Sequence, residues 1–529
     1  MSETTATATS GSTLAPAKGK RAARTPSGKS GWPFGLSDRV ATWILAALLA
    51  IWAGALRLYN LGHVKTLIFD EVYYVRDAYT LLREGTEHAW AKDISKAAFE
   101  RGDVDSYLPD PQYVVHPPVG KWVIALGEWA LGADNPWGWR ISVALLGTLS
   151  VVLLFFTVRR LLGNTVLAFI AGYLLSIDGV HLTHSRTSLL DLTLGFFCLL
   201  AFYFLLRDRD QFRTALSRIE GAERGFGHVM GIRWWRIAAG ISLGLACGVK
   251  WSGLYFVAVF GIMTVLWDWA ARKRYGDPRW KLRGFALDAI PAFFAIVGSA
   301  LVTYVFSWSG WFASKDGYFR NWAEENSHAS NPVSEALLSL WHYHTEAYSF
   351  HVGLDSTHTY GAKPWLWLLQ LRPTSFYYES YTYGEVGCQV EKCSAAITNI
   401  GNPLIWWFGT FALLVTLVIA IVKRNGTAAA ILSGIIAGYV PWFLYLDRTI
   451  FQFYSVVFEP WLIMAIVFVF ALMLGGRTAP RTRKRVVTLA IASLVVTMTL
   501  VSIFWWPLWT AQVIPYDLWR AHMWFDSWV

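Results

Sequence analysis

The stretch Val40-Ala-Thr-Trp-Ile-Leu-Ala-Ala-Leu-Leu-Ala-Ile-Trp-Ala-Gly-Ala-Leu-Arg-Leu58 holds a single charged residue, Arg57. At a rise of about 1.5 Å per residue, a helix of this length crosses the roughly 30 Å hydrocarbon layer of a bilayer. The stretch therefore predicts a transmembrane helix. The same pattern recurs along the rest of the chain.

Composition places the whole chain in one class. Of its 529 residues, 55% are hydrophobic and 16% are charged, and the mean hydropathy is +0.37. These values exclude an ordinary soluble domain and predict an all-α polytopic membrane protein. We expect about eleven spans, at the apolar runs 40–58, 138–158, 165–181, 189–206, 236–250, 252–270, 285–307, 403–422, 427–446, 453–475 and 486–507.

Lys and Arg collect in every second connection between these runs. Arg159 and Arg160 follow the second run, residues 272–274 follow the sixth, and Lys423 and Arg424 follow the eighth. By the positive-inside rule these connections are cytoplasmic, which puts the N-terminus in the cytoplasm and the C-terminus outside. The net charge of +10 is thereby assigned to topology and not to nucleic-acid binding. We expect a multi-pass protein of the cell membrane.

Loop lengths and composition suggest how the chain is divided. Residues 1–38 have too little apolar content to fold, and we expect a disordered basic cytoplasmic tail. Two connections on the extracytoplasmic face, 60–136 and 309–401, are far longer than the rest. Ordered loops of this length are usually functional. We expect a catalytic transmembrane module at 39–308, then the 309–401 loop, then transmembrane helices and an extracytoplasmic tail at 402–529.

The first long loop carries the acidic pair Asp70 and Glu71 within Leu67-Ile-Phe-Asp-Glu-Val-Tyr-Tyr74. Adjacent residues do not share a helix face, so the two carboxylates are not expected to share a proton. One can act on a reacting hydroxyl as a general base while the other holds an Arg, a Lys or backbone donors. We assign the base to Asp70. The alternative is a pair of capping acids at a helix N-terminus.

The same loop continues with Val115-His-Pro-Pro-Val-Gly-Lys-Trp122 and an apolar stretch as far as Trp129. Proline opens helices and tryptophan favours the headgroup zone of a membrane, which together predict an interfacial helix. His116 and Lys121 could bind an anionic headgroup there. The alternative is a snorkelling Lys and a His that packs in the turn.

Several cations lie at the outer ends of the predicted spans, against the usual charge rule. Such charges need a local reason, and the phosphate of a lipid is the simplest common partner. Lys250 is the strongest candidate for binding a lipid phosphate. The run 236–249 before it is short, so the turn that carries Lys250 could line a water-filled cavity below the membrane surface. The alternative is snorkelling or an ion pair with an acid such as Asp178 or Asp191. The cations are Arg57, Arg140, Arg186, Lys250 and Arg448.

The second long loop carries aromatic and polar residues in Ser356-Thr-His358-Thr-Tyr360 and in Pro364-Trp365. His358, Tyr360 and Trp365 suit stacking on a sugar or on an extended peptide. An interfacial anchor is the safer interpretation of the tryptophan.

The cysteines of the chain and the histidines of this loop do not form a pattern typical of a metal site. Cys388 and Cys393 lie where oxidation is permitted, and we expect a short disulfide between them. Cys198 and Cys247 lie inside spans and are expected to be inert packing residues. The three histidines within 342–351 lack a recognised metal-ligand spacing, so no protein-bound metal is expected.

Together these motifs resemble the protein O-mannosyltransferases, a branch of the GT-C integral-membrane glycosyltransferases that use polyprenyl-phosphate sugars. The resemblance runs over nearly the whole spanning region. It implies a GT-C fold in which the two long extracytoplasmic loops carry interfacial helices. The matching motifs are Arg57-Leu-Tyr, Phe69-Asp-Glu-Val, His116-Pro-Pro-x-Gly-Lys121, Trp139-Arg140, Arg186-x4-Asp191, Gly248-Val-Lys250, Ser356-x-His358-x-Tyr360 and Pro364-Trp365.

The resemblance implies an inverting transferase that moves mannose from polyprenyl-phosphate mannose to Ser or Thr of secreted proteins, with the Sec translocon as a further partner. Asp70 and Glu71 match the catalytic pair of the family, and Arg186 and Asp191 are expected to be structural. No cofactor is required, and a divalent cation is optional. The donor phosphate is expected to be held by some of Arg57, Arg140, Lys250, Arg448, Lys121 and His116.

Two departures from the eukaryotic members resemble the bacterial, especially actinobacterial, branch. The 309–401 loop is too short for the sugar-binding-like MIR domain, and Val114 stands where those members have Asp.

Two other functions stay open. A related GT-C enzyme could move another sugar to a lipid or glycan acceptor, or the chain could be a transporter, although a transporter would place its ionisable residues nearer mid-span.

Overall fold

The computed structural model describes residues 36–91, 95–218, 231–326, 331–476 and 478–529. The tail expected at residues 1–38 falls almost wholly outside them. Residues 45–529 form one compact unit, and residues 1–44 belong to a second. The first described helix, α1 (Asp38–Leu58), begins in the unit of residues 1–44 and ends in the unit of residues 45–529.

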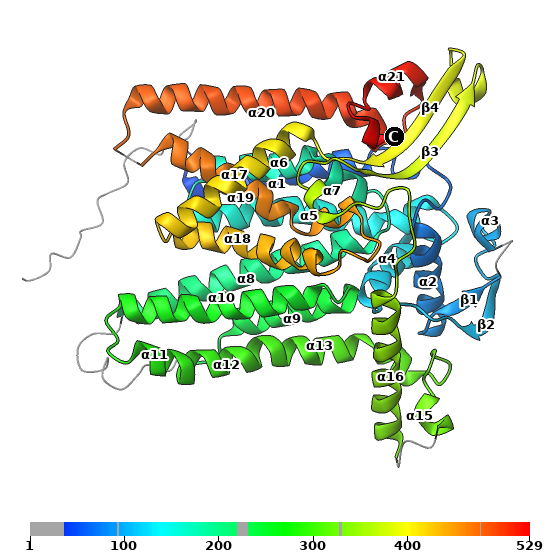
Figure 1. Ribbon diagram of the computed structural model, residues 1–529, viewed down its shortest axis with the longest axis horizontal. Helices are drawn as coiled ribbons and strands as arrows, with labels where there is room; N and C mark the ends of the chain where they lie inside the picture. Colours follow the sequence, from blue (N-terminus) through cyan, green and yellow to red (C-terminus); the bar gives the residue numbers. More distant parts are fainter. Residues whose placement is uncertain (1–35, 92–94, 219–230, 327–330, 477) are drawn as a thin grey trace, which may run out of the picture. The chain divides into compact units, whose positions relative to one another are not determined.

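Within the described residues, eight helices are long and apolar enough to cross a membrane, and three shorter apolar helices accompany them. Together they account for all eleven predicted runs, which confirms the all-α polytopic fold (Figure 1). The long helices are α1, α5 (Pro136–Leu162), α8 (Leu190–Arg218), α10 (Gly253–Arg274), Trp280–Ser307, α17 (Pro403–Val422), Gly426–Leu444 and α20 (Arg481–Trp509). The shorter ones are α6 (Thr165–Ile177), α9 (Trp234–Val249) and α19 (Glu459–Leu474).

Several spans are interrupted. The predicted run 165–181 divides because Asp178 accepts a hydrogen bond from the backbone N–H of Val180 at 2.9 Å and starts a new helix. The pieces of interrupted spans are α7 (Gly179–His184), α11 (Trp280–Arg283), α12 (Ile290–Phe293) and α13 (Ser299–Ser307) with π-helical segments Gly284–Ala289 and Phe294–Gly298 between them, α18 (Gly426–Gly438) with the 3₁₀ turn Val440–Leu444, and the 3₁₀ turn Gln452–Val457 before α19.

Glycines on α9 set how closely its neighbours approach. A methyl group at Gly244 would lie 2.5 Å from the carbonyl oxygen of Ala300 on α13. At Gly248 it would lie 2.5 Å from a methyl group of Val119, at the start of the interfacial helix of the first loop. Small residues allow this close packing. The end of α9, with Lys250 just beyond it, is thereby fixed against the first long loop.

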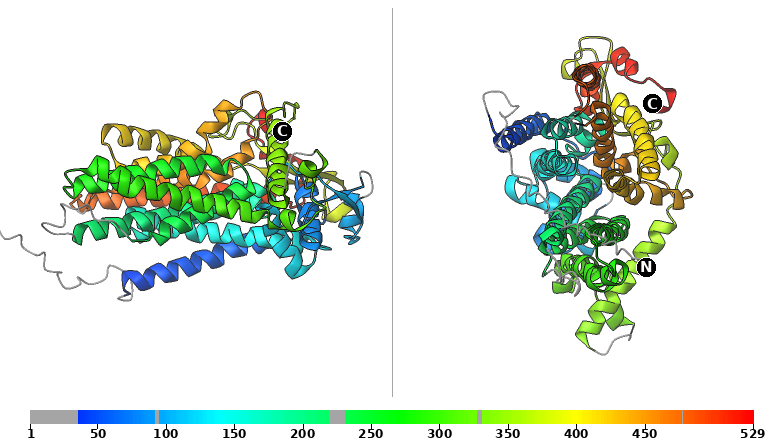
Figure 2. Two further views of the ribbon diagram at one scale, coloured as in Figure 1. Left: turned by 90° about the horizontal axis from the view of Figure 1, so that it is seen from below. Right: turned by 90° about the vertical axis from the view of Figure 1, so that its left-hand side faces the viewer.

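The two long loops gather at one end of the helices of residues 45–529 (Figure 1 and Figure 2). In the first loop β1 and β2 pair antiparallel, and in the second β3 and β4 form an antiparallel hairpin that β5 extends. The first loop contains α2 (Glu71–Glu84), β1 (His88–Trp90), α3 (Ser95–Glu100), β2 (Tyr107–Pro111) and α4 (Val119–Leu131). The second contains α14 (Ser309–Ala313), α15 (Trp322–Glu325), α16 (Pro332–Val352), β3 (Thr374–Thr382) and β4 (Lys392–Asn399), while β5 (Ile514–Pro515) and α21 (Tyr516–Ala521) follow α20.

Helix α16 has the features of an interfacial helix. It crosses the ends of the spanning helices nearly at right angles to them (Figure 1 and Figure 2). Leu337, Trp341, Tyr348 and Val352 are exposed at helical spacing and form one apolar stripe. Such a stripe suits the boundary between headgroups and acyl chains. In the first loop, α4 likewise exposes Trp129.

Cys388 and Cys393 are joined by a disulfide next to the turn of the β3–β4 hairpin. The bond closes the end of the hairpin. The two other cysteines, Cys198 and Cys247, are free and buried.

Candidate active site

A cavity of about 650 Å³ lies where the two long loops meet. Its walls come from α2, from the segment before α4, from the end of α16 and from the segments around residues 354–358 and 448–454. It brings together six residues that the sequence singled out, and they are Asp70, His116, Lys121, Lys250, His358 and Arg448.

Asp70 immediately precedes α2 and lines this cavity. The residue before it, Phe69, adopts a φ of 48°, a conformation that is strained for an aromatic residue. Ring contacts hold Phe69 in place, with centroid distances of 4.9 Å to Phe376 and 5.5 Å to Phe453. The packed aromatic ring therefore fixes the sharp turn that places Asp70 at the cavity wall.

The environment of Asp70 raises its pKa from the usual 3.8 to about 6. Burial is the largest cause, and the negative charge of Asp191 adds to it. The positive charge of Lys250 and a hydrogen bond from Tyr74 act in the opposite direction. A carboxylate with this pKa is ionised at neutral pH yet basic enough to take a proton from a hydroxyl in a transition state.

Glu71 occupies a different place from Asp70, because it is fully buried and does not line the cavity. Its two oxygens accept from Nε and Nη2 of Arg140 at 2.8 and 2.6 Å. They also accept from the backbone N–H groups of Ser188 at 2.9 Å and Ile68 at 3.1 Å. All of its acceptor directions are thus used inside the protein, and the carboxylate anchors the turn that carries Asp70.

Arg140, expected at the donor phosphate, lies behind Asp70 instead. Besides Glu71, it donates to the carbonyl oxygens of Val64 at 2.7 Å and Thr66 at 3.0 Å. The side chain is 1% exposed. These bonds use four of its five N–H groups, so the guanidinium group clamps the segment before α2.

Arg57 and Arg186 are also held by protein groups away from the cavity. Arg57 is fully buried, donates to Ser185 Oγ at 3.1 Å and lies 2.8 Å from His181 Nδ1. Arg186 donates to the carbonyl oxygens of Arg57 at 2.9 Å and Tyr59 at 2.7 Å, which closes the C-terminal end of α1. Neither arginine lines the cavity, and the roles expected for Arg57 and Arg186 stay predictions.

Lys121 lines the cavity, but its charge is compensated. The ammonium group forms an ion pair with Glu87 and donates to the carbonyl oxygen of His116 at 3.1 Å. The ring of His116 stacks on that of His351 with centroids 5.1 Å apart. Burial lowers the pKa of both imidazoles, to about 4 for His351 and well below 6.5 for His116, so both rings are neutral at pH 7.

Lys250 and Arg448 are the other cations in the cavity wall. Lys250 Nζ lies 2.8 Å from Asp191 Oδ2 and 5.3 Å from the ring centre of Tyr454. Arg448 Nη2 lies 3.3 Å from His351 Nδ1, and its Nε is buried and makes no hydrogen bond to any described residue. Of the expected phosphate ligands, Arg448 has the most unused donor capacity.

A second cavity of about 260 Å³ adjoins the first. The two share a boundary of cationic, imidazole and phenol groups. Beyond it the second cavity is largely aromatic and apolar, with Trp251, Leu254 and Val352 among its walls. The shared residues are His116, Lys250, His351, Arg448 and Tyr454.

The three residues expected to bind sugar or acceptor are separated in the structure. His358 lines the main cavity, and its ring lies 5.0 Å from that of Phe451. Tyr360 and Trp365 do not line it, and Tyr360 lies under the guanidinium of Arg372 at 5.3 Å. The sequence reasoning missed Asp77, which also lines the cavity.

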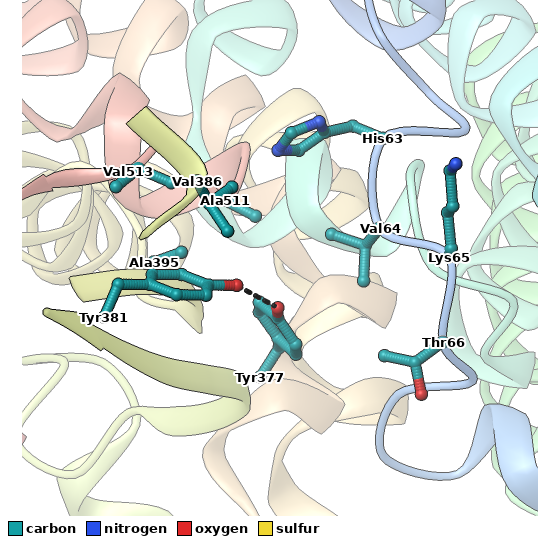
Figure 3. Close-up of a pocket in the computed structure, with 10 residues that line it drawn as sticks. All are labelled: His63, Val64, Lys65, Thr66, Tyr377, Tyr381, Val386, Ala395, Ala511 and Val513. Atoms are coloured by element: carbon teal, nitrogen blue, oxygen red, sulfur yellow. Dashed lines mark hydrogen bonds between the residues drawn. The ribbon is translucent and has the colours of Figure 1, made fainter. Parts of the chain in front are cut away.

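Figure 3 shows a further cavity, of about 340 Å³, between residues 63–66 and the β3–β4 hairpin. The hydroxyl groups of Tyr377 and Tyr381 approach each other to 3.5 Å in its wall. No carboxylate belongs to this lining, in contrast to that of the main cavity. Over the described part of the chain, no group of three or more His, Cys, Asp or Glu could hold a metal ion. The expectation that no metal is bound stays a prediction.

Comparison with known proteins gives the family. A model described as dolichyl-phosphate-mannose-protein mannosyltransferase matches residues 47–302, and one for the C-terminal four-transmembrane region of protein O-mannosyltransferase matches residues 336–528. The polyprenol-phosphate-mannose–protein mannosyltransferase of Mycolicibacterium smegmatis is 35% identical over 514 residues, which cover 94% of each chain. The chain belongs to the protein mannosyltransferase family.

Two further matches agree with this assignment. The mannosyltransferase of the same description from Corynebacterium glutamicum is 34% identical and covers 92% of this chain and 93% of its own. Among solved structures, the S. cerevisiae protein O-mannosyltransferase Pmt1-Pmt2 complex bound to the sugar donor matches with a TM-score of 0.71 at 14% identity, over 93% of each chain. The GT-C fold and the family expected from the sequence are thereby confirmed.

Proposed function

We propose that the main cavity transfers mannose from a polyprenyl-phosphate carrier to a Ser or Thr hydroxyl of a polypeptide in a single inverting displacement. One observation carries this proposal. An ionisable carboxylate, Asp70, lines the same cavity as Arg448, whose Nε has no hydrogen-bond partner among the described residues, and that cavity adjoins an aromatic compartment. The relatives are named for a polyprenol-phosphate mannose donor and a protein acceptor, which supports the same assignment.

The donor phosphate fits the boundary between the two cavities. Arg448 and Lys250 place two positive charges there, next to the neutral rings of His116 and His351. Charge that develops on the departing phosphate would be stabilised by these cations, so the reaction needs no general acid.

The second cavity suits the isoprenoid chain of the donor. Its walls include Leu254, Tyr348 and Val352, whose side chains are more than half exposed and apolar or aromatic. Tyr348 and Val352 belong to the membrane-facing stripe of α16. A carrier lipid could thus keep its tail in the bilayer while its phosphate reaches Arg448.

In this scheme Asp70 accepts the proton of the acceptor hydroxyl as its oxygen attacks the anomeric carbon from the side opposite the phosphate. The C–O bond to the phosphate breaks as the new C–O bond forms, and the phosphate leaves with the bonding pair. Glu71 and Arg140 keep the turn before α2 in place and do not touch the substrate.

The membrane orientation expected from the charge pattern belongs to the same proposal. We place the N-terminus in the cytoplasm, and the C-terminus and active site outside the cell membrane, where secreted proteins leave the Sec translocon. Membership of an enzyme family favours the transferase over the transporter considered from sequence alone.

Thiol labelling of intact cells checks this orientation. An impermeant maleimide is expected to label the protein only after reduction of the Cys388–Cys393 disulfide opens the end of the hairpin, because Cys198 and Cys247 lie inside the apolar helices α8 and α9. The double variant Cys388→Ser/Cys393→Ser should take no label. Labelling that requires permeabilised cells would put the hairpin, and the active site, in the cytoplasm.

The variant Arg448→Ala is expected to raise the donor KM by roughly 10- to 100-fold, because it removes charge-assisted hydrogen bonds to the phosphate. The measurement is initial rate against donor concentration with purified protein in lipid nanodiscs. Arg101→Ala removes an exposed arginine of the first loop outside the cavity and should leave the donor KM unchanged. An unchanged donor KM in Arg448→Ala would remove Arg448 from the phosphate site.

The rate of transfer is expected to rise with pH through about 6, because Asp70 must be ionised to act as base. Lys250 lowers the pKa of Asp70 by favouring the ionised form. In Lys250→Met that charge is lost and Asp191 stays unpaired, so the pKa of Asp70 rises. The acidic limb of the pH–rate profile, where the rate rises with pH, then moves to higher pH. A pH profile of kcat checks both expectations, and a limb that moves to lower pH would contradict them.

A transfer assay with radiolabelled polyprenyl-phosphate mannose tests the function itself. Purified protein is given a Ser/Thr-rich peptide and a glycolipid acceptor in parallel. Label on the peptide supports the proposal. Label on the glycolipid alone would favour the related GT-C activity.

A further inference from the structure

The proposed reaction leaves one acid of the main cavity without a role. Asp77 lies on α2 seven residues after Asp70, so the two positions share a helix face about 10 Å apart along the axis. Tyr74 lies between them on the same face. All three residues line the cavity.

The described residues around Asp77 leave one oxygen of its carboxylate without a hydrogen-bond partner. The residue is 4% exposed, and its Oδ1 is buried without a hydrogen-bond partner among the described residues. The nearest charges belong to Lys121 on α4, to Glu87 and to Arg76. Lys121 is already paired with Glu87. A buried acceptor left unsatisfied is costly, which suggests that a ligand supplies the missing donors.

The lining around Asp77 suits a neutral ligand rich in hydroxyl groups. The lining of the same cavity includes Gln112, Tyr113 and Val114, which offer amide, phenol and apolar surfaces. Burial raises the pKa of Asp77 to about 7, so its neutral and ionised forms are both populated at neutral pH, and hydroxyl groups of a ligand can bond to either form. The cations proposed for the phosphate, Lys250 and Arg448, lie at the boundary with the second cavity, which Asp77 does not line.

We propose that Asp77 binds hydroxyl groups of the donor sugar and thereby contributes to the choice of sugar. The inference rests on the proposed function, because it takes Asp70 to be the base at the anomeric carbon. The axial distance between the two acids leaves room for one hexose ring with a hydrogen bond at its far end. A site built to bond a substrate hydroxyl discriminates strongly against an analogue that lacks it.

The first test compares Asp77→Asn with the parent protein in nanodiscs. The donor KM is expected to rise roughly 10- to 100-fold, because a charge-assisted hydrogen bond is lost, while the acceptor-peptide KM stays the same. Glu128→Gln is the matched control, because Glu128 is also buried, has no partner for either oxygen among the described residues and lies outside the cavity lining. Asp77→Ser is measured in parallel, so that a folding defect in one variant does not decide the outcome.

The second test uses donors that each lack one hydroxyl of mannose. In the parent protein one of these monodeoxy donors should lose as much affinity as Asp77→Ser loses with mannose. In Asp77→Ser that donor should carry little further penalty, because the shortened side chain no longer reaches the position of the missing hydroxyl. A merely structural role for Asp77 would leave the two penalties additive.

Other outcomes would overturn the inference in distinguishable ways. A rise in the acceptor-peptide KM instead of the donor KM would assign Asp77 to the binding of the polypeptide. Unchanged constants would remove Asp77 from substrate binding. A parent protein that transfers no mannose to any acceptor would contradict the proposed function and not the role of Asp77 alone.

Discussion

Replacing Asp70 with Asn is expected to lower kcat by about 10²- to 10⁴-fold, the usual contribution of a general base. The amide has nearly the shape of the carboxylate but cannot take the proton of the acceptor hydroxyl. Phe69 and Glu71, which fix the turn, are unchanged, so the fold and the donor affinity should be retained. The measurements are kcat for transfer and the donor Kd, both on purified protein.

Asp110→Asn provides the matched control for this variant. Asp110 is an exposed acid of β2 in the same long loop and does not line the cavity. Its substitution should leave kcat unchanged. Full activity in Asp70→Asn would remove Asp70 from the mechanism, and loss of donor binding would show that its role is not confined to the proton.

Breaking the ion pair behind Asp70 is expected to have the largest effect on stability. In Arg140→Met the carboxylate of Glu71 stays buried without its partner, which costs about 3–5 kcal/mol. The midpoint of thermal unfolding and the rate of transfer should both fall. The double variant Glu71→Leu/Arg140→Met removes the uncompensated charge, so it should unfold at a higher temperature than Arg140→Met and remain nearly inactive.

Arg520→Met is the control for that comparison. Arg520 and Asp526 form an exposed ion pair at 3.2 Å, and such pairs contribute about 0–1 kcal/mol. Its thermal midpoint should be close to that of the parent protein. An Arg140→Met variant as stable as Arg520→Met, or a fully active double variant, would show that the clamp does not hold the active-site turn.

Much of the fold could be predicted because membrane spans are local in sequence. Apolar runs such as 40–58 and 403–422 correspond closely to α1 and α17. The interruption of the run 165–181 was not predicted, because the capping role of Asp178 depends on the conformation of the turn. The approach of the two long loops to one cavity follows from packing between segments far apart in sequence, which no local pattern reports.

The site was predictable where chemistry and position agree. Asp70 was identified because an acid that follows a span needs a reason to be there, and the structure places it in the cavity. Arg140 and Arg57 satisfy the same positional rule, yet they bond to Glu71 and Ser185, 69 and 128 residues away. Position at the end of a span cannot tell a ligand-binding arginine from one that bonds to distant protein groups.

Asp77 could have been found from the sequence. Its spacing of seven residues from Asp70 is the helical repeat that returns a side chain to the same face. The sequence motif pairs Asp70 with its neighbour Glu71. In the structure, the helix that starts at Glu71 places Asp77, and not Glu71, in the cavity wall beside Asp70.

The anomeric configuration of the product tests the central claim most directly. Purified protein is supplied with polyprenyl-phosphate mannose of known configuration and a peptide with one Ser, and the linkage in the product is determined by NMR. A single displacement with Asp70 as base predicts a mannosyl-serine of configuration opposite to that of the donor. Retention of configuration would require a covalent sugar intermediate and would contradict the assignment of Asp70 as a base.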